Sequence, residues 1–201
     1  VEELGVGPGL VEYYAGLAVS TNALAAALMA PIWGSLADRY GRKPMMVRAA
    51  FVMIFTMGGM AFVPNVFWLL VLRVLNGVFT GYIPNATALI ASQVPKDKTG
   101  YALGTLSTGA VAGNLIGPTL GGVLAEMFGV HTVFLLVGLL YAIVVILTVF
   151  YIREDFVPIK KSDALPVKEV FAQVKDRKIL AGLFVTSMVI IAAAQAVVPI
   201  L

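Results

Sequence analysis

The sequence predicts an all-α fold, a polytopic bundle of transmembrane helices, and three observations support this prediction. Of the 201 residues, 60% are hydrophobic and 12% are charged, and the mean hydropathy is +0.94, whereas soluble domains contain about 45–50% apolar residues. Apolar stretches of roughly 18–20 residues, the length that crosses a bilayer, recur along the chain. Lysine and arginine gather in alternate connections between these stretches, as they do in multi-pass membrane proteins.

The apolar stretches define six predicted membrane spans. In chain order they cover residues 13–36, 44–63, 66–94, 101–127, 132–152 and 179–201. The third span is long enough to tilt in the bilayer. The fourth is rich in glycine and threonine and only moderately apolar, which predicts a helix buried among other helices. Since the sequence starts at Val1 and ends inside an apolar stretch, we expect it to be a fragment of a longer, transporter-sized chain.

The basic residues predict the orientation and the domain boundaries. One set of connections carries lysine and arginine, and the opposite set carries acidic residues and the single histidine, His131. The positive-inside rule places the basic set, including residues 34–44, in the cytoplasm. Arg48 lies one turn into the second span, where it could snorkel towards the same side. The longest polar connection, 153–178, separates an N-terminal transmembrane half, 1–152, from the start of a C-terminal half, 179–201.

The connection 153–178 contains a short helical pattern of its own. Four apolar residues recur at i, i+3, i+4 and i+7, namely Val167, Val170, Phe171 and Val174. This spacing, following Pro166, predicts an amphipathic helix on the cytoplasmic surface of the membrane. A flexible charged linker is the alternative.

Composition excludes several classes of site. The chain has no cysteine and one histidine, so disulfides and thiolate metal sites are excluded and we expect no metal centre. The pI is about 9.2, but the basic residues follow membrane sidedness, so we expect no nucleic-acid partner. The sequence offers no nucleophile–base set of the kind that catalysis needs, so we do not expect an enzyme.

The first motif is GSLADRYGRKP, residues 34–44. It follows the pattern G-x-x-x-D-R-x-G-R-K, whose members are Gly34, Asp38, Arg39, Gly41, Arg42 and Lys43. The glycines permit close helix approach and a tight turn, and Pro44 suits the start of the next helix. Asp38 can pair locally or reach a neighbouring helix end. Because ion pairs in water are weak, a gate built on them opens easily.

The second motif surrounds Arg73, a basic residue deep in the third span. Residues 70–77 follow the pattern L-x-x-R-x-x-N-G, with Asn76 and Gly77 completing it. An arginine in the membrane is costly, so it should face the bundle interior and have a partner. A fixed positive charge can shift the pKa of a nearby acid without titrating itself, which suits proton coupling. The alternatives are that Arg73 snorkels outward or that it only ties helices together.

The third motif lies in the fourth span, from Gly109 to Gly122. Glycines recur every four residues and give one nearly bare helix face, and Pro118 predicts a kink. The motif residues are Gly113, Gly117, Pro118, Gly121 and Gly122. Such a face suits close packing and rocking between helices, although packing alone would also explain it.

Polar residues within the spans are candidates for the lining of a substrate cavity. They are Asn22, Asn76, Tyr82, Asn85 and Asn114. Asn76, Tyr82 and Asn85 lie on the same predicted span as Arg73 and belong to its polar stripe.

Together the three motifs resemble the major facilitator superfamily, and within it the drug:proton antiporter group of multidrug efflux transporters. Residues 34–43 are similar to the superfamily loop between helices 2 and 3, residues 73–77 to the arginine motif of helix 4, and residues 113–122 to the antiporter motif of helix 5. The resemblance covers the whole chain as helices 2 to 6, the central loop and much of helix 7 of twelve. It departs at Asn76, where the pattern commonly has glutamine.

The resemblance implies a secondary active transporter of the cytoplasmic or inner membrane, in which two halves rock around a midplane site. It implies that Asp38 and Arg39 join a cytoplasmic latch, that Arg73 assists proton coupling, and that the glycine-rich helix lies at the interface of the halves. The expected partners are small amphipathic drugs and membrane lipid, with the proton as coupling ion, no cofactor, and a monomeric full-length protein. The proton-carrying acid is expected outside this chain.

Two other functions fit the same sequence. One is a metabolite or sugar carrier of the same superfamily, which a strongly charged cavity would favour. The other is a non-transporting membrane scaffold or receptor, in which substitution of Asp38 or Arg73 would leave the phenotype intact.

Overall fold

The computed structural model describes residue 7, residues 10–156 and the isolated positions 182, 185, 186 and 189. The chain divides into two compact units, Val1–Pro158 and Ile159–Leu201. The regular elements of the first unit are six helices, which agrees with the all-α prediction. The predicted amphipathic helix and most of the predicted sixth span lie outside the described residues.

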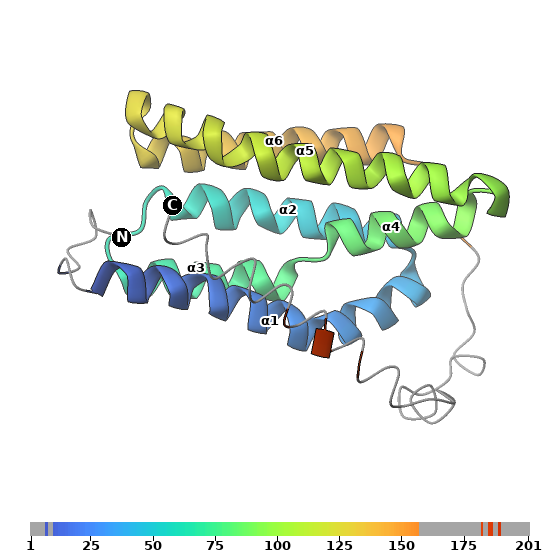
Figure 1. Ribbon diagram of the computed structural model, residues 1–201, viewed down its shortest axis with the longest axis horizontal. Coiled ribbons are helices and arrows are strands. Elements are labelled where there is room, and N and C mark those ends of the chain that lie inside the picture. Colours follow the sequence, from blue (N-terminus) through green and yellow to red (C-terminus); the bar gives the residue numbers. More distant parts are fainter. Residues whose placement is uncertain (1–6, 8–9, 157–181, 183–184, 187–188, 190–201) are drawn as a thin grey trace. The chain divides into compact units, whose positions relative to one another are not determined.

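The six helices of the first unit form a bundle with α2 at its centre (Figure 1). In chain order they are α1 (Val11–Tyr40), α2 (Arg42–Met60), α3 (Val66–Phe79), α4 (Tyr82–Gln93), α5 (Lys96–Phe128) and α6 (Val130–Tyr151). The α2 helix contacts α1, α3, α4 and α6, and α5 contacts α4 and α6. Met46, Ala49, Ala50 and Met53 of α2 are buried, so this helix is the centre of the core.

Among the described residues, four helical segments are long and apolar enough to cross a membrane. They are Tyr13–Tyr40, Val66–Gln93, Lys96–Phe128 and Val130–Tyr151, and they correspond to the predicted first, third, fourth and fifth spans. The α2 helix occupies the predicted second span but is not among these four. Arg42, Lys43 and Arg48 reduce the hydropathy of its 19 residues, and contacts with four other helices enclose it.

The predicted third span is not one continuous helix. The α3 helix ends at Phe79 and α4 starts at Tyr82, and Gly81 between them has φ +129°. Pro84 follows in the first turn of α4 and carries no backbone N–H, so it cannot continue the hydrogen-bond ladder. The combination of Gly81 and Pro84 therefore breaks the span near its middle.

The predicted burial of α5 among other helices is not seen within the described part of the chain. The helix runs without interruption through Pro118, and none of its residues is buried in the part of the chain that the structure describes. A Cβ added at Gly109, Gly113, Gly117 or Gly121 would meet no heavy atom within 4 Å. The reason is position: among the described helices α5 packs against α6 and α4 (Figure 1), and its glycine face meets no other helix.

The α1 and α3 helices approach each other closely at Gly77. A Cβ on Gly77 would lie 2.2 Å from the backbone oxygen of Asn22 and 3.0 Å from the Cβ of Ala25. Gly77 is buried, so neither backbone can move away without disturbing its neighbours. This approach explains why the residue after Asn76 is glycine.

We expect Gly77→Ala to lower the free energy of unfolding of the full-length protein by about 1–3 kcal/mol, because overpacking forces the two backbones apart. Thermal unfolding of the purified protein in detergent measures the change. Gly16→Ala on α1 is the matched control, since a Cβ there meets nothing within 4 Å. Equal melting temperatures for the two variants would contradict the prediction.

Candidate functional site

Residues 34–44, expected as a loop, are two helix ends joined by a single residue. The α1 helix ends at Tyr40 and α2 starts at Arg42, with Gly41 between them at φ +97°. The Gly41 N–H donates to the carbonyl of Ala37 at 3.0 Å, which terminates α1. The predicted tight turn at Gly41 is therefore present. Gly34, predicted to permit close approach, is exposed, and a Cβ there would meet nothing within 4 Å.

Glu154, which follows α6, caps the N-terminus of α2. Its Oε1 accepts a hydrogen bond from the Arg42 N–H at 2.7 Å, and its Oε2 accepts one from the Lys43 N–H at 2.8 Å. Both N–H groups lie in the first turn, where no intrahelical acceptor exists, and the helix dipole favours a negative charge there. A Cβ on Gly41 would lie 2.8 Å from Oε2. Gly41 thus provides both the turn and the space for the carboxylate.

Two further contacts tie the same end of the bundle together. Lys43 Nζ donates to the carbonyl of Val149, near the end of α6, at 2.8 Å. The Gln93 amide, in the orientation that satisfies both its atoms, donates to the Arg153 carbonyl at 3.2 Å and accepts from the Asp155 N–H at 2.8 Å. The ends of α2, α4 and α6 are therefore joined by polar contacts.

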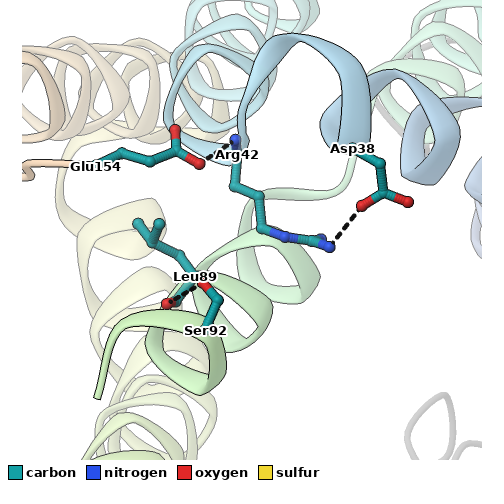
Figure 2. A network of polar contacts seen from close by, with 5 residues as sticks. All are labelled: Asp38, Arg42, Leu89, Ser92 and Glu154. Atoms are coloured by element: carbon teal, nitrogen blue, oxygen red, sulfur yellow. Dashed lines mark hydrogen bonds and ion pairs between the residues drawn. The ribbon is translucent and has the colours of Figure 1, made fainter. Parts of the chain in front are cut away.

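Asp38 pairs locally rather than with a distant helix end. Its Oδ1 accepts from Arg42 Nη2 at 2.8 Å, and the two side chains are 48% and 28% exposed. Figure 2 shows Arg42 between Glu154, which binds its backbone N–H, and Asp38, which binds its guanidinium. Such an exposed pair contributes about 0–1 kcal/mol, so it can exchange partners easily. Arg39 is exposed in the last turn of α1.

Arg73 lies at the opposite end of α1 and α2 from this turn and faces a cavity. The cavity has a volume of about 250 Å³ and is lined by Ala15, Ala18, Val19, Met60, Val63, Leu69, Arg73, Val130, His131 and Phe134. The Arg73 Nε is buried and has no hydrogen-bond partner among the described residues. His131, on the same wall, contacts the carbonyl of Ala61 through Nδ1. Arg73 thus lines a cavity, but the partner predicted for it is not found at Nε among the described residues.

Asn22 and Asn76 meet in one polar network that crosses three helices. Asn22 Nδ2 donates to Asn76 Oδ1 at 3.0 Å and to the Arg73 carbonyl at 2.9 Å. Asn76 Nδ2 donates to Thr56 Oγ1 of α2 at 3.1 Å. Asn76 is 6% exposed, so its amide holds α1, α2 and α3 together beside Arg73.

The other three cavity candidates lie elsewhere. The Tyr82 hydroxyl and Thr148 Oγ1 of α6 are 2.8 Å apart and hydrogen-bonded. Asn85 donates to the carbonyl of Gly81 at 2.8 Å and lines a separate pocket between α1 and α4. Asn114 is exposed on α5, on the same helix as the glycine face. The five candidates therefore do not line a single cavity within the described residues.

Sequence reasoning missed Trp33 and Glu154, and it did not foresee the contacts of Arg48. The Arg48 guanidinium lies 3.4 Å from the ring centroid of Trp33 and donates to the carbonyls of Phe79 and Thr80 at 3.4 Å each. Charge did not single out Glu154, because the connection 153–178 holds four other acidic residues, Asp155, Asp163, Glu169 and Asp176. Trp33 and Arg48 offer no local pattern, since they meet only after the helices pack.

No cluster of three or more metal-binding side chains occurs among the described residues.

Comparison with known proteins places these features in a family. The family model described as the Major Facilitator Superfamily matches residues 1–201. The chain is 61% identical over 201 residues to the multi-drug resistance efflux pump PmrA of Streptococcus pneumoniae, covering 100% of this chain and 50% of that protein. It is 58% identical to a PmrA homolog of Lactococcus lactis over 99% of this chain and 49% of that one. It is 46% identical to the multidrug resistance protein MdtG of Proteus mirabilis over 100% and 50%. The chain thus spans about half the length of these curated relatives.

We expect Glu154→Gln to lower the free energy of unfolding by about 1.5–3 kcal/mol, because the amide keeps one acceptor oxygen and loses the charge that binds two N–H groups. Thermal unfolding of the full-length protein measures the effect, with Glu126→Gln, an exposed acid on α5, as control. A Glu154→Gln protein as stable as the control would show that the cap contributes nothing.

Proposed function

Because the chain belongs to the major facilitator superfamily, we propose that the full-length protein is a proton-coupled antiporter that exports amphipathic drugs by alternating access. The observation that carries the proposal is the similarity of the whole chain to proteins named multidrug efflux pumps, at 58–61% identity. The antiporter glycine motif on α5 and the arginine motif on α3 support the same direction of transport.

In this proposal the full-length protein lies in the cell membrane or inner membrane. The end of the bundle that carries Gly41 and Glu154 faces the cytoplasm. The support is the concentration of lysine and arginine in the connections at this end. Here Asp38, Arg39 and Arg42 serve as a gate. The exposed Asp38–Arg42 pair costs little to break, and Arg42 is held in place by its backbone through Glu154, so the side chains can exchange partners while the turn stays fixed.

Arg73 serves proton coupling in this proposal. It is a fixed charge beside a mostly apolar cavity, where it lowers the pKa of any carboxylate brought close to it. The acidic residues of α1 to α6, at positions 12, 38, 97 and 126, lie within the first or last turn of their helices. The proton-carrying acid therefore belongs to another part of the full-length protein.

The uncovered glycine face of α5 serves as the surface on which the two halves rock. This role is supported by the open space at the four glycines that recur along the face, where an added Cβ would meet no heavy atom within 4 Å. Small residues let helix backbones approach closely and slide past one another. Substrate contacts come from polar residues beside the apolar pockets, among them Asn85 and Tyr82, which suits small amphipathic compounds. The expected assembly is a monomer in contact with membrane lipid.

We expect that adding a drug substrate dissipates a preset pH gradient in everted vesicles that contain the full-length protein, because each exported drug exchanges for protons. A pH-sensitive dye records the gradient, and vesicles without the protein give the background. A gradient that no substrate disturbs, in vesicles that still transport drug, rules out proton coupling. Transport of sugars or metabolites instead of drugs would favour a carrier of the other substrate class.

We expect Asp38→Asn to reduce drug transport about tenfold while membrane abundance falls less than twofold, since the lost ion pair is too weak to unfold the protein. Drug efflux rate and immunoblot abundance are measured on the same membranes. Equal losses in both quantities would make Asp38 a folding determinant, and unchanged transport would favour a scaffold or receptor.

A further inference from the structure

The break between α3 and α4 leaves backbone carbonyls without helical partners inside a membrane span. The α3 helix ends at Phe79, so the carbonyls of Val78 and Phe79 lie in its last turn, where the intrahelical acceptors have no donor. The Thr80 carbonyl would require the N–H of residue 84, which is a proline. An unsatisfied carbonyl in a bilayer costs several kcal/mol in principle, and lipid offers no donor.

Side chains from two other helices supply the missing donors. Trp33 of α1 donates its indole Nε1–H to the Val78 carbonyl at 2.6 Å. Arg48 of α2 donates Nη2–H to the carbonyls of Phe79 and Thr80. The Arg48 guanidinium also lies 3.4 Å from the centroid of the Trp33 ring, and the Trp33 and Phe79 rings are 5.7 Å apart. Three helices thus meet at one cation.

The position of Arg48 is unusual for a structural arginine. Its Nε and Nη1 are buried and have no hydrogen-bond partner among the described residues, so the side chain is kept here at a cost. Its charge faces the C-terminal end of α3, which carries partial negative charge. In transporters the C-terminal ends of broken helices coordinate the coupling cation. Here the Arg48 guanidinium, a cation of the protein itself, lies at the C-terminal end of α3.

We propose that Arg48 is a tethered cation that holds the α3–α4 break closed and so positions the first turn of α4 for substrate. The proposal rests on the proposed function, because that turn carries Tyr82 and Asn85. A pocket of about 340 Å³ lies beside the break between α1 and α4, and its lining includes Trp33, Thr80, Gly81, Pro84 and Asn85. Trp33 and Thr80 belong both to this wall and to the contacts of Arg48, so displacement of Arg48 changes the shape of the pocket.

The test uses a cysteine-free version of the full-length protein with a Thr80→Cys reporter, modified by a water-soluble thiol reagent in the absence of drug and of a pH gradient. We expect Arg48→Met to raise the modification rate about tenfold, the change produced by loss of a charged hydrogen bond. Arg48→Lys keeps the charge and should raise the rate less. Trp33→Phe keeps an aromatic ring, loses the indole donor, and should raise the rate about fivefold. Lys98→Met, an exposed cation on α5, is the control.

A second readout separates this role from general stability. Tyr82 and Asn85 follow the break in α4, so Arg48→Met should raise the apparent KM for drug more than it lowers the maximal rate, whereas a general loss of stability lowers the maximal rate together with membrane abundance. If Arg48→Met leaves the modification rate unchanged, or lowers the maximal rate without raising the KM, the proposal is wrong. Since the assay requires no transport, a protein that exports nothing can still confirm the role of Arg48, and the proposed function would then fail alone.

Discussion

A backbone polar group inside a bilayer must have a partner, and this requirement governs the described helices. Most backbone N–H and C=O groups find a partner within their own helix. The groups at the α1–α2 turn and at the α3–α4 break depend instead on side chains from distant parts of the chain. At the α1–α2 turn, the carboxylate of Glu154 accepts from two N–H groups of α2. At the α3–α4 break, Trp33 and Arg48 donate to three carbonyls. In each case the charge has the sign that the helix end attracts, an anion at an N-terminus and a cation at a C-terminus.

The same requirement explains how the helices recognise one another. Lipid tails are as apolar as leucine, so burial of apolar surface does not select one helix pairing over another in a membrane. The α1–α3 pair instead uses the close backbone approach at Gly77 and the hydrogen bonds from Asn22 to Asn76 and to the Arg73 carbonyl. Asn76 extends this network to Thr56 of α2. A motif that the sequence displays around an arginine therefore also fixes the packing of three helices.

Hydropathy and charge predicted the helical fold, the approximate bounds of the spans and the turn at Gly41, because these depend on local sequence. Position within the bundle was harder. The glycine-rich composition of α5 predicted burial, but no residue of α5 is buried among the described residues. Composition shows that a helix face can pack closely, and it does not show which helix packs against it. The break at Gly81 was readable from Gly81 and Pro84 together, but the apolar run through it favoured one long span. The partners of Arg48 and Glu154 were not predictable, because their hydrogen bonds join residues at least 31 positions apart and Trp33, 15 positions before Arg48, lies on another helix.

The basic residues show why counting charges is a weaker argument than locating them. The positive-inside rule treats Arg42, Lys43 and Arg48 alike, since all three lie in the first two turns of α2. Arg42 pairs with an exposed carboxylate and Lys43 reaches the end of α6, so both lie where the rule expects them. Arg48 turns into the bundle, where it meets an aromatic ring and a broken helix. A cation kept inside a membrane protein at that cost has to be explained by what it holds, and here it holds the point at which the α3–α4 span changes direction.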